Sequence, residues 1–107
     1  MKARSPITTH VLDLVKGKPA AGLAVTLSRK DKQGWKELAR GQTNADGRVE
    51  DLLEAGSKVD AGVYRLVFET QSFYPSITIE FQLSDPSQHH HIPLLLSPYG
   101  YSTYRGS

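Results

Sequence analysis

The chain has 107 residues, and its 13 Lys and Arg outnumber its 11 Asp and Glu, which gives a formal net charge of +2 at pH 7. This length predicts one domain over residues 1–107, and so weak a positive charge, without a basic run, argues against a nucleic-acid partner. The absence of cysteine excludes disulfides and a thiol nucleophile, and no apolar run approaches membrane-spanning length, so we expect no membrane partner.

Residues 1–6 lack the apolar stretch of a secretory signal, so we expect the protein in the cytoplasm. Beyond them, segments of β-strand type recur roughly every dozen residues. We expect strands at residues 9–15, 23–29, 35–41, 48–52, 63–69, 76–83, 89–96 and 99–104.

Turn-forming residues separate these segments, because Gly, Pro, Asn and Asp supply the dihedral angles and local hydrogen bonds of tight turns. They lie at residues 17–19, 31–34, 44–47, 60–62, 85–86 and 97–98. Many short strands with regular turns predict an all-β fold, a two-sheet antiparallel β-sandwich of about eight strands. No segment has the length and period of a substantial helix, and residues 52–56 are expected to form one short turn at most.

The segment 89–96 divides by its period of two into a core face and an outer face. The core face holds Ile92, Leu94 and Leu96. The outer face holds His89, His91, Pro93 and Leu95. Because a half-apolar outer face is unusual in water, it suggests contact with another subunit. Pro93 has no N–H for a sheet ladder, so its amide side is expected at an edge or a bulge.

Histidine is the side chain best matched to proton transfer at neutral pH, and the chain has four. His10 is a candidate for that role, and the alternative is that it is an ordinary surface residue of a strand. The triplet at 89–91 is a candidate as well, or a solvated strand end. His89 and His91 share a face and would suit a metal ion, but no third ligand is recognisable, so we predict no metal site.

Other candidates bind polar groups rather than move protons. Arg48, which follows the turn at 44–47, is suited to a carbonyl or anionic oxygen, or is an exposed strand-edge arginine. Four polar side chains near the end of the chain are suited to orient a polar ligand: Ser102, Tyr104, Arg105 and Ser107. The alternative for these four is a polar outer face, with Tyr99 and Tyr101 packed in the core.

Four stretches together resemble one known family. They are the Thr-His-Val-Leu-Asp of residues 9–13, the Gly-Lys-Pro-Ala of 17–20, the Thr-Asn-Ala-Asp-Gly-Arg of 43–48, and residues 91–107, which end in Tyr-Arg-Gly-Ser. In this order they closely resemble the 5-hydroxyisourate hydrolases, the transthyretin-related enzymes of urate breakdown. The terminal tetrapeptide is specific to the enzyme branch.

The resemblance implies a transthyretin-like sandwich assembled as a homotetramer, a dimer of dimers, with sites where dimers meet. It implies hydrolysis of the cyclic amide of the purine-derived substrate 5-hydroxyisourate, without a cofactor. The catalytic residues implied are His10, Arg48, His91 and Ser107, and the substrate-binding residues are His10, Arg48, His91, Ser102, Tyr104 and Arg105. The alternatives are a noncatalytic small-ligand carrier of the transthyretin type and a structural or adhesive sandwich domain.

One departure from the family lies between the strands ending near Glu69 and starting near Ser76. Family members usually carry a longer segment there, often with a short helix. In this chain only residues 70–75 intervene. Because the segment is so short, the resemblance does not establish a helix here. The matching site positions lie outside this segment.

Overall fold

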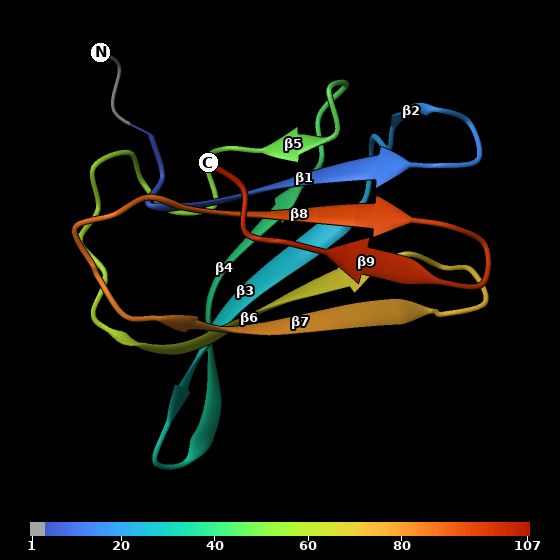
Figure 1. Cartoon of the computed structure of the whole chain (residues 1–107). Helices are drawn as coiled ribbons and strands as arrows, with labels where there is room; N and C mark the ends of the chain where they lie inside the picture. The colour runs from blue at the N-terminus through green and yellow to red at the C-terminus, as the bar shows by residue number, and fades with distance from the viewer. Residues whose placement is uncertain (1–3) are drawn as a thin grey trace.

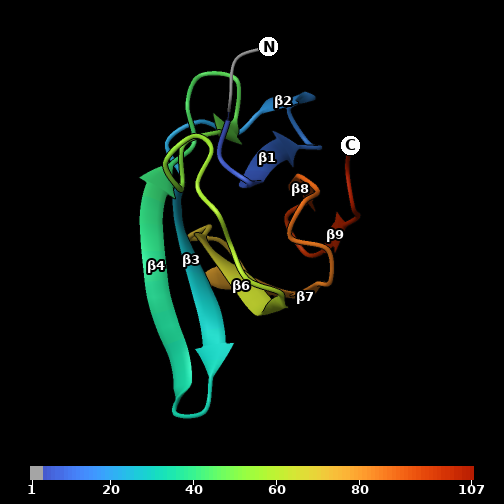
Figure 2. The same cartoon turned by 90° about the vertical axis from the view of Figure 1, so that its left-hand side faces the viewer.

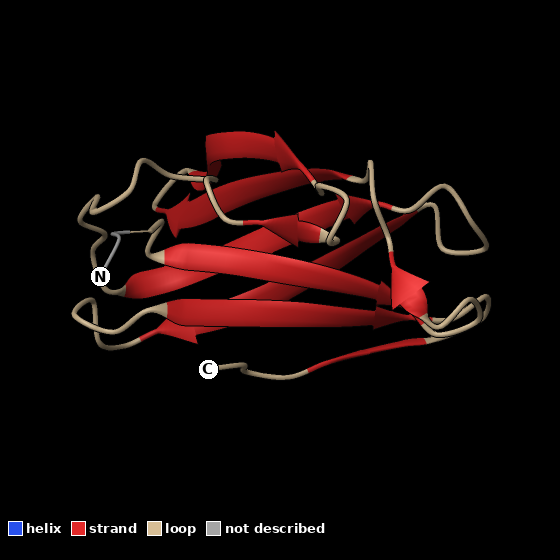
Figure 3. Ribbon diagram, turned by 90° about the horizontal axis from the view of Figure 1, so that it is seen from above, coloured by secondary structure: helices blue, strands red, loops and turns tan. Residues whose placement is uncertain are grey.

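Every regular element among residues 4–107, the part of the chain that the computed structural model describes, is a β-strand (Figure 3). The strands are β1 (Ile7–Asp13), β2 (Lys18–Pro19), β3 (Ala24–Asp31), β4 (Gly34–Gln42), β5 (Arg48–Val49), β6 (Gly62–Glu69), β7 (Ser76–Leu83), β8 (His90–Leu96) and β9 (Tyr101–Thr103). The predicted all-β class is therefore confirmed. Strand bounds differ from prediction by a few residues, and β2 forms where a turn was expected.

The strands form two stacked sheets, which are seen edge-on in Figure 2. One sheet has the order β4-β3-β6-β7, and the other has the order β2-β1-β8-β9 with β5 also paired to β1. The predicted two-sheet sandwich is confirmed. One neighbouring pair departs from the antiparallel expectation, because β1 and β8 run parallel. Parallel pairing needs a long connection, and here the whole other sheet lies between these two strands in the sequence (Figure 1).

The core lies between the sheets because alternate residues of each strand point inward. In β7 the inward residues Ile77, Ile79 and Leu83 are buried, while Thr78 and Glu80 between them are exposed. Comparable alternation in the facing sheet buries a second set of side chains. This set includes Ile7, Val11, Val49, Ile92 and Leu94. The core therefore leaves the other face of β1 and β8 free for polar side chains.

Pro93 interrupts the ladder between β8 and the end of the chain. Its carbonyl accepts a hydrogen bond from Thr103 Oγ1 at 2.6 Å, so this residue faces β9. The missing N–H lies on the same side, because the two backbone groups of a strand residue point the same way. Regular pairing stops at Thr103 and resumes as a single bridge between His91 and Gly106. The intervening residues, Tyr104 and Arg105, are thus free of the ladder.

Pro93 is buried within its own chain, whereas the sequence placed it on an outer, half-apolar face expected to contact another subunit. The reason is Gly106, whose backbone lies so close that a Cβ there would be 3.2 Å from Pro93 Cγ. Leu95 and Leu96 are only partly buried, although Leu96 still packs against the core. The end of the chain thus covers part of the face that had been expected to meet a partner.

The short connection between β6 and β7 contains no helix. Thr70 and Gln71 donate their backbone N–H groups to the carbonyl of Pro75, at 3.1 and 3.0 Å. These bonds close a tight loop, so the helix that the family often carries here is absent from this segment. No helix among residues 4–107 has the length and apolar character to span a bilayer.

Candidate active site

Strand pairing sets Arg48 beside His10. Residues His10 and Arg48 are partners in the antiparallel pairing of β1 with β5. The turn before β5 holds this register: the Asn44 side chain accepts N–H bonds from Asp46 and Arg48 at 2.9 and 3.0 Å, and Val11 donates to the Gly47 carbonyl at 2.8 Å. A short turn thus carries the guanidinium to a histidine 38 positions earlier in the sequence.

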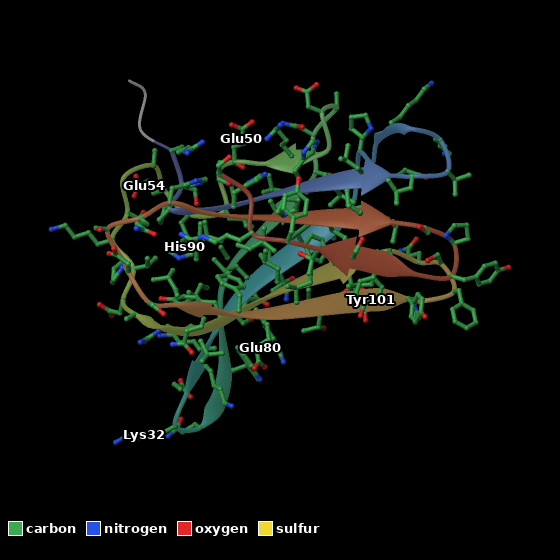
Figure 4. All side chains as sticks on the ribbon, viewed as in Figure 1. Lys32, Glu50, Glu54, Glu80, His90 and Tyr101 are labelled. Carbon is green, nitrogen blue, oxygen red and sulfur yellow. The ribbon has the colours of Figure 1, made fainter. Side chains whose placement is uncertain are left out.

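The parallel register of β1 with β8 brings His91 to the same place. Thr8 is opposite His91, and His10 is opposite Pro93. Because residues two apart share a face, His10 and His91 both lie on the outer face of the sheet. Their ring centroids are 6.4 Å apart. His90 points the other way and is buried, on the side of β8 that faces β7 (Figure 4).

The end of the chain closes the site. Gly106 donates its N–H to the His91 carbonyl at 2.8 Å, and a Cβ on Gly106 would lie 2.7 Å from His91 Cδ2. Glycine is therefore required for the tail to pass so close to the imidazole. A pocket of about 400 Å³ results, lined by His10, Arg48, His91, Tyr104, Arg105, Gly106 and Ser107.

Six of the seven predicted site residues are therefore brought together, and Ser102 is not among the residues lining this pocket. Ser102 lies within β9, opposite Leu95, before the chain leaves the ladder. Gly106 was predicted only as part of the matching terminal tetrapeptide and not as a site residue, and Thr8, whose hydroxyl contacts His91 Nδ1, was not predicted. The signal for Thr8 was its position two residues before His10, on the same face, and the signal for Gly106 was the specific terminal tetrapeptide.

The electrostatics of the pocket favour neutral imidazoles. Burial lowers the pKa of His10 below its ordinary value, and the charge of Arg48 lowers it further, against an opposing effect of Asp46. Burial also lowers the pKa of His91, helped by Arg48, His89, His10 and Arg4. A neutral imidazole accepts a proton, so both rings are suited to act as bases near pH 7.

The pocket combines proton acceptors with a permanent cation. The guanidinium of Arg48 remains charged at any working pH and presents several N–H donors to a developing oxyanion. Such a set supports attack of water on an activated carbonyl. A wider pocket of about 500 Å³, reached between Asp13, Leu23, Thr70 and Pro98, has no histidine or arginine in its lining. Size alone does not identify the functional pocket.

Within residues 4–107, no three or more His, Cys, Asp or Glu side chains gather in a way that would hold a metal ion. His89 and His91 lie side by side, with ring centroids 6.3 Å apart. Thr8 lies between them, with its hydroxyl oxygen 2.9 Å from His89 Nε2 and 2.7 Å from His91 Nδ1. A cofactor-free site remains a prediction.

The fold and this polar pocket define a transthyretin-like sandwich, and comparisons with known proteins agree. The family model described as "HIUase/Transthyretin family" matches residues 7–106. The 5-hydroxyisourate hydrolase of Mus musculus is 46% identical over 114 residues, covering 96% of this chain and 96% of the mouse protein. The chain therefore belongs to the HIUase/transthyretin family.

This chain is similar to solved structures from both branches of the family, the hydrolases and the transthyretins. The 5-hydroxyisourate hydrolase of Klebsiella pneumoniae is 36% identical with a TM-score of 0.79, covering 94% of this chain and 98% of that one. Sea bream transthyretin, solved in complex with thyroxine, is 32% identical with a TM-score of 0.87, covering 95% of each chain. Since the backbone is similar to both, the side chains of the pocket must distinguish enzyme from carrier.

Replacing Arg48 tests the electrostatics of the pocket. Because its charge lowers the pKa of His10 and His91, Arg48→Gln is expected to raise both pKa values toward about 6.5. Burial, the larger cause, remains, so the rise is partial. The measurement is an NMR titration of the imidazole ring protons in the variant and the parent protein.

The matched control is Arg65→Gln, since Arg65 lies on the other sheet with its guanidinium 4.4 Å from the centre of the Trp35 ring. This control is expected to leave both titrations unchanged. A pKa of His10 and His91 that stays constant or falls in Arg48→Gln would contradict the proposed arrangement.

Proposed function

We propose that this protein is a 5-hydroxyisourate hydrolase, which opens the cyclic amide of its substrate to a ureidoimidazoline carboxylate in urate degradation. One observation carries the proposal: His10, Arg48, His91 and Ser107 line a single pocket. The chain also belongs to a family whose curated members include the mouse 5-hydroxyisourate hydrolase, at 46% identity. The pocket volume of about 400 Å³ is within the range that binds small molecules.

His10 orients the attacking water and accepts its proton. Its lowered pKa keeps the imidazole neutral near pH 7, which is the form that a general base needs. As the water oxygen bonds to the amide carbon, negative charge develops on the carbonyl oxygen. The Arg48 guanidinium, paired across the ladder from His10, holds that oxygen and stabilises the charge.

Collapse of this intermediate breaks the ring carbon–nitrogen bond. The nitrogen leaves with a proton, and the acyl carbon keeps the new oxygen as a carboxylate. His91 binds substrate or shares in these proton transfers. Tyr104, Arg105 and Ser107 at the chain end orient the ring, because all three line the same pocket. No step requires a metal or an organic cofactor.

A noncatalytic carrier is the alternative function on this fold. The relatives favour the enzyme, since the mouse hydrolase is 46% identical. Among solved structures, identity is 36% to the Klebsiella hydrolase and 32% to sea bream transthyretin. The pocket favours it too. Two neutral imidazoles and a guanidinium supply bases and an oxyanion partner, which a carrier does not need.

We further propose that the protein is a cytoplasmic homotetramer, built as a dimer of dimers. Large apolar side chains remain exposed in the described residues of the single chain: Leu14, Val15, Leu38, Phe73, Tyr99, Tyr101 and Tyr104. Leu14 and Val15 follow β1, at the end of the sheet whose outer face carries the pocket. Covering them with other subunits would remove apolar surface from water and exclude solvent from the site.

Adding the purified protein to freshly generated 5-hydroxyisourate tests the function. We expect the ultraviolet signal of the substrate to decay much faster than in buffer. His10→Asn is expected to lower kcat by about 10²–10⁴-fold, the range typical of a lost general base. Arg48→Ala should lower kcat and raise KM, because this side chain contacts substrate and transition state.

His90→Ala is the comparison for these variants, since His90 lies on the opposite side of β8 and is absent from the pocket lining. Its kcat is expected to stay close to that of the parent. Substrate decay at the spontaneous rate in the presence of the parent protein would refute the hydrolase and favour the carrier. An equal loss in His90→Ala and His91→Ala, with both variants still assembled as the parent is, would place the site elsewhere.

Light scattering at micromolar concentration tests the assembly. The expected mass is that of four chains, and Val15→Asp, which puts a charge on an exposed apolar residue, should shift it toward smaller species. The exposed Lys32→Asp, at the tip of the β3–β4 hairpin far from this surface (Figure 4), is the control. A monomer mass with full activity would contradict the tetramer.

A further inference from the structure

A buried threonine joins two histidines behind the pocket. The Thr8 side chain is 3% exposed, and its hydroxyl oxygen lies 2.7 Å from His91 Nδ1 and 2.9 Å from His89 Nε2. Both distances are those of hydrogen bonds. Neither Thr8 nor His89 lines the pocket, whereas His91 does. Thr8 therefore connects a pocket residue to a titratable group outside the pocket.

The backbone explains why these three side chains meet. Thr8 and His91 are opposite one another in the parallel pairing of β1 with β8. His89, two residues before His91, points to the same side as His91, and the two rings are stacked within 19° of parallel. The sheet thus fixes Thr8 beside His91, and His89 joins them from the residue directly before β8.

A hydroxyl group has a single proton, so Thr8 donates to one ring nitrogen and accepts from the other. In one arrangement Thr8 donates to His91 Nδ1 and accepts from His89 Nε2–H. In the second, His91 Nδ1–H donates to Thr8, and Thr8 donates to His89 Nε2. The second arrangement leaves His91 Nε2 unprotonated, and this is the ring nitrogen that Thr8 leaves available to a substrate.

We propose that Thr8 is a positioning residue that relays a proton between His91 and His89, an inference that rests on the hydrolase function proposed above. When His91 Nε2 accepts a proton during the reaction, the Nδ1 proton passes to Thr8 Oγ1. The Thr8 hydroxyl proton passes at the same time to His89 Nε2. His91 stays neutral, Thr8 is unchanged, and His89, which holds its other proton on Nδ1, becomes an imidazolium. The reverse transfer returns a proton to the leaving nitrogen.

Each histidine of the relay lies near a cation. Burial and then Arg48 lower the pKa of His91, whereas burial, Arg4 and His90 lower the pKa of His89. Moving the positive charge from His91 to His89 therefore takes it away from Arg48 and places it near Arg4, so the relay rests on the hydrogen bonds through Thr8. The charged and titratable groups that face His91 from the surrounding elements are Arg4, His10, Arg48, His89, Tyr104 and Arg105.

Three variants test the relay by steady-state kinetics. Thr8→Val keeps the shape of the side chain and removes the hydroxyl, so kcat should fall about 10- to 100-fold, as when a metal-site histidine loses its outer hydrogen-bond partner, while KM changes little. Thr8→Ser keeps the hydroxyl and should restore most of kcat. His89→Gln should be as slow as Thr8→Val, because a Gln amide bonds to Thr8 but accepts no proton.

Two outcomes would overturn the relay. One is a parent-like kcat in Thr8→Val. The other is a slow Thr8→Val with a parent-like His89→Gln, which would mean that the hydroxyl only holds the ring of His91 in place.

A readout independent of activity separates this inference from the proposed function. Nitrogen-15 NMR of the imidazoles reports which ring nitrogens carry protons. In the parent protein we expect His91 Nδ1 and His89 Nε2 to be in opposite states, and the two rings to titrate together. In Thr8→Val they should titrate separately. Independent titration in the parent would overturn the relay even if hydrolysis is observed, and coupled titration would support it even if the substrate is another.

Discussion

The parallel pairing of β1 with β8 is the constraint on which the rest of the site depends. It joins the first and the penultimate strands of the chain, so residues more than 80 positions apart share one sheet surface. The core face of this pair is apolar, with Val11 and Leu94 fully buried. Because a one-residue slip would turn that apolar set outward, burial fixes the register. The same register then fixes the histidines on the outer face.

The chain end adds the second layer of the site. Pro93 removes one ladder N–H, and the paired strand is released at Tyr104 and Arg105 before it returns at Gly106. The Gly106 bridge to the His91 carbonyl holds the tail over the pocket. A glycine fits there because any Cβ would strike the His91 ring. One proline and one glycine thereby convert an ordinary strand end into the wall of a polar pocket.

Much of the fold and of the site could be predicted from the sequence, and each prediction that was wrong has a physical reason. Strand existence and the opposite faces of His90 and His91 follow from a period of two. The pairing of Arg48 with His10 depends on long-range register, which spacing does not reveal; the family resemblance implied only that both residues belong to one site. Pro93 was expected on an outer face that contacts another subunit, but the tail of its own chain covers it. Ser102 was expected in the pocket, but it stays in the β9 ladder.

The most direct test of this account is a crystal structure of the protein with a bound urate-like ring that cannot be hydrolysed. We expect density for the ring between His10, Arg48 and His91, with a ring oxygen at the Arg48 guanidinium. We also expect a second subunit to close the pocket. Density in the wider pocket beside Asp13 and Pro98, with the histidine pocket empty, would contradict it.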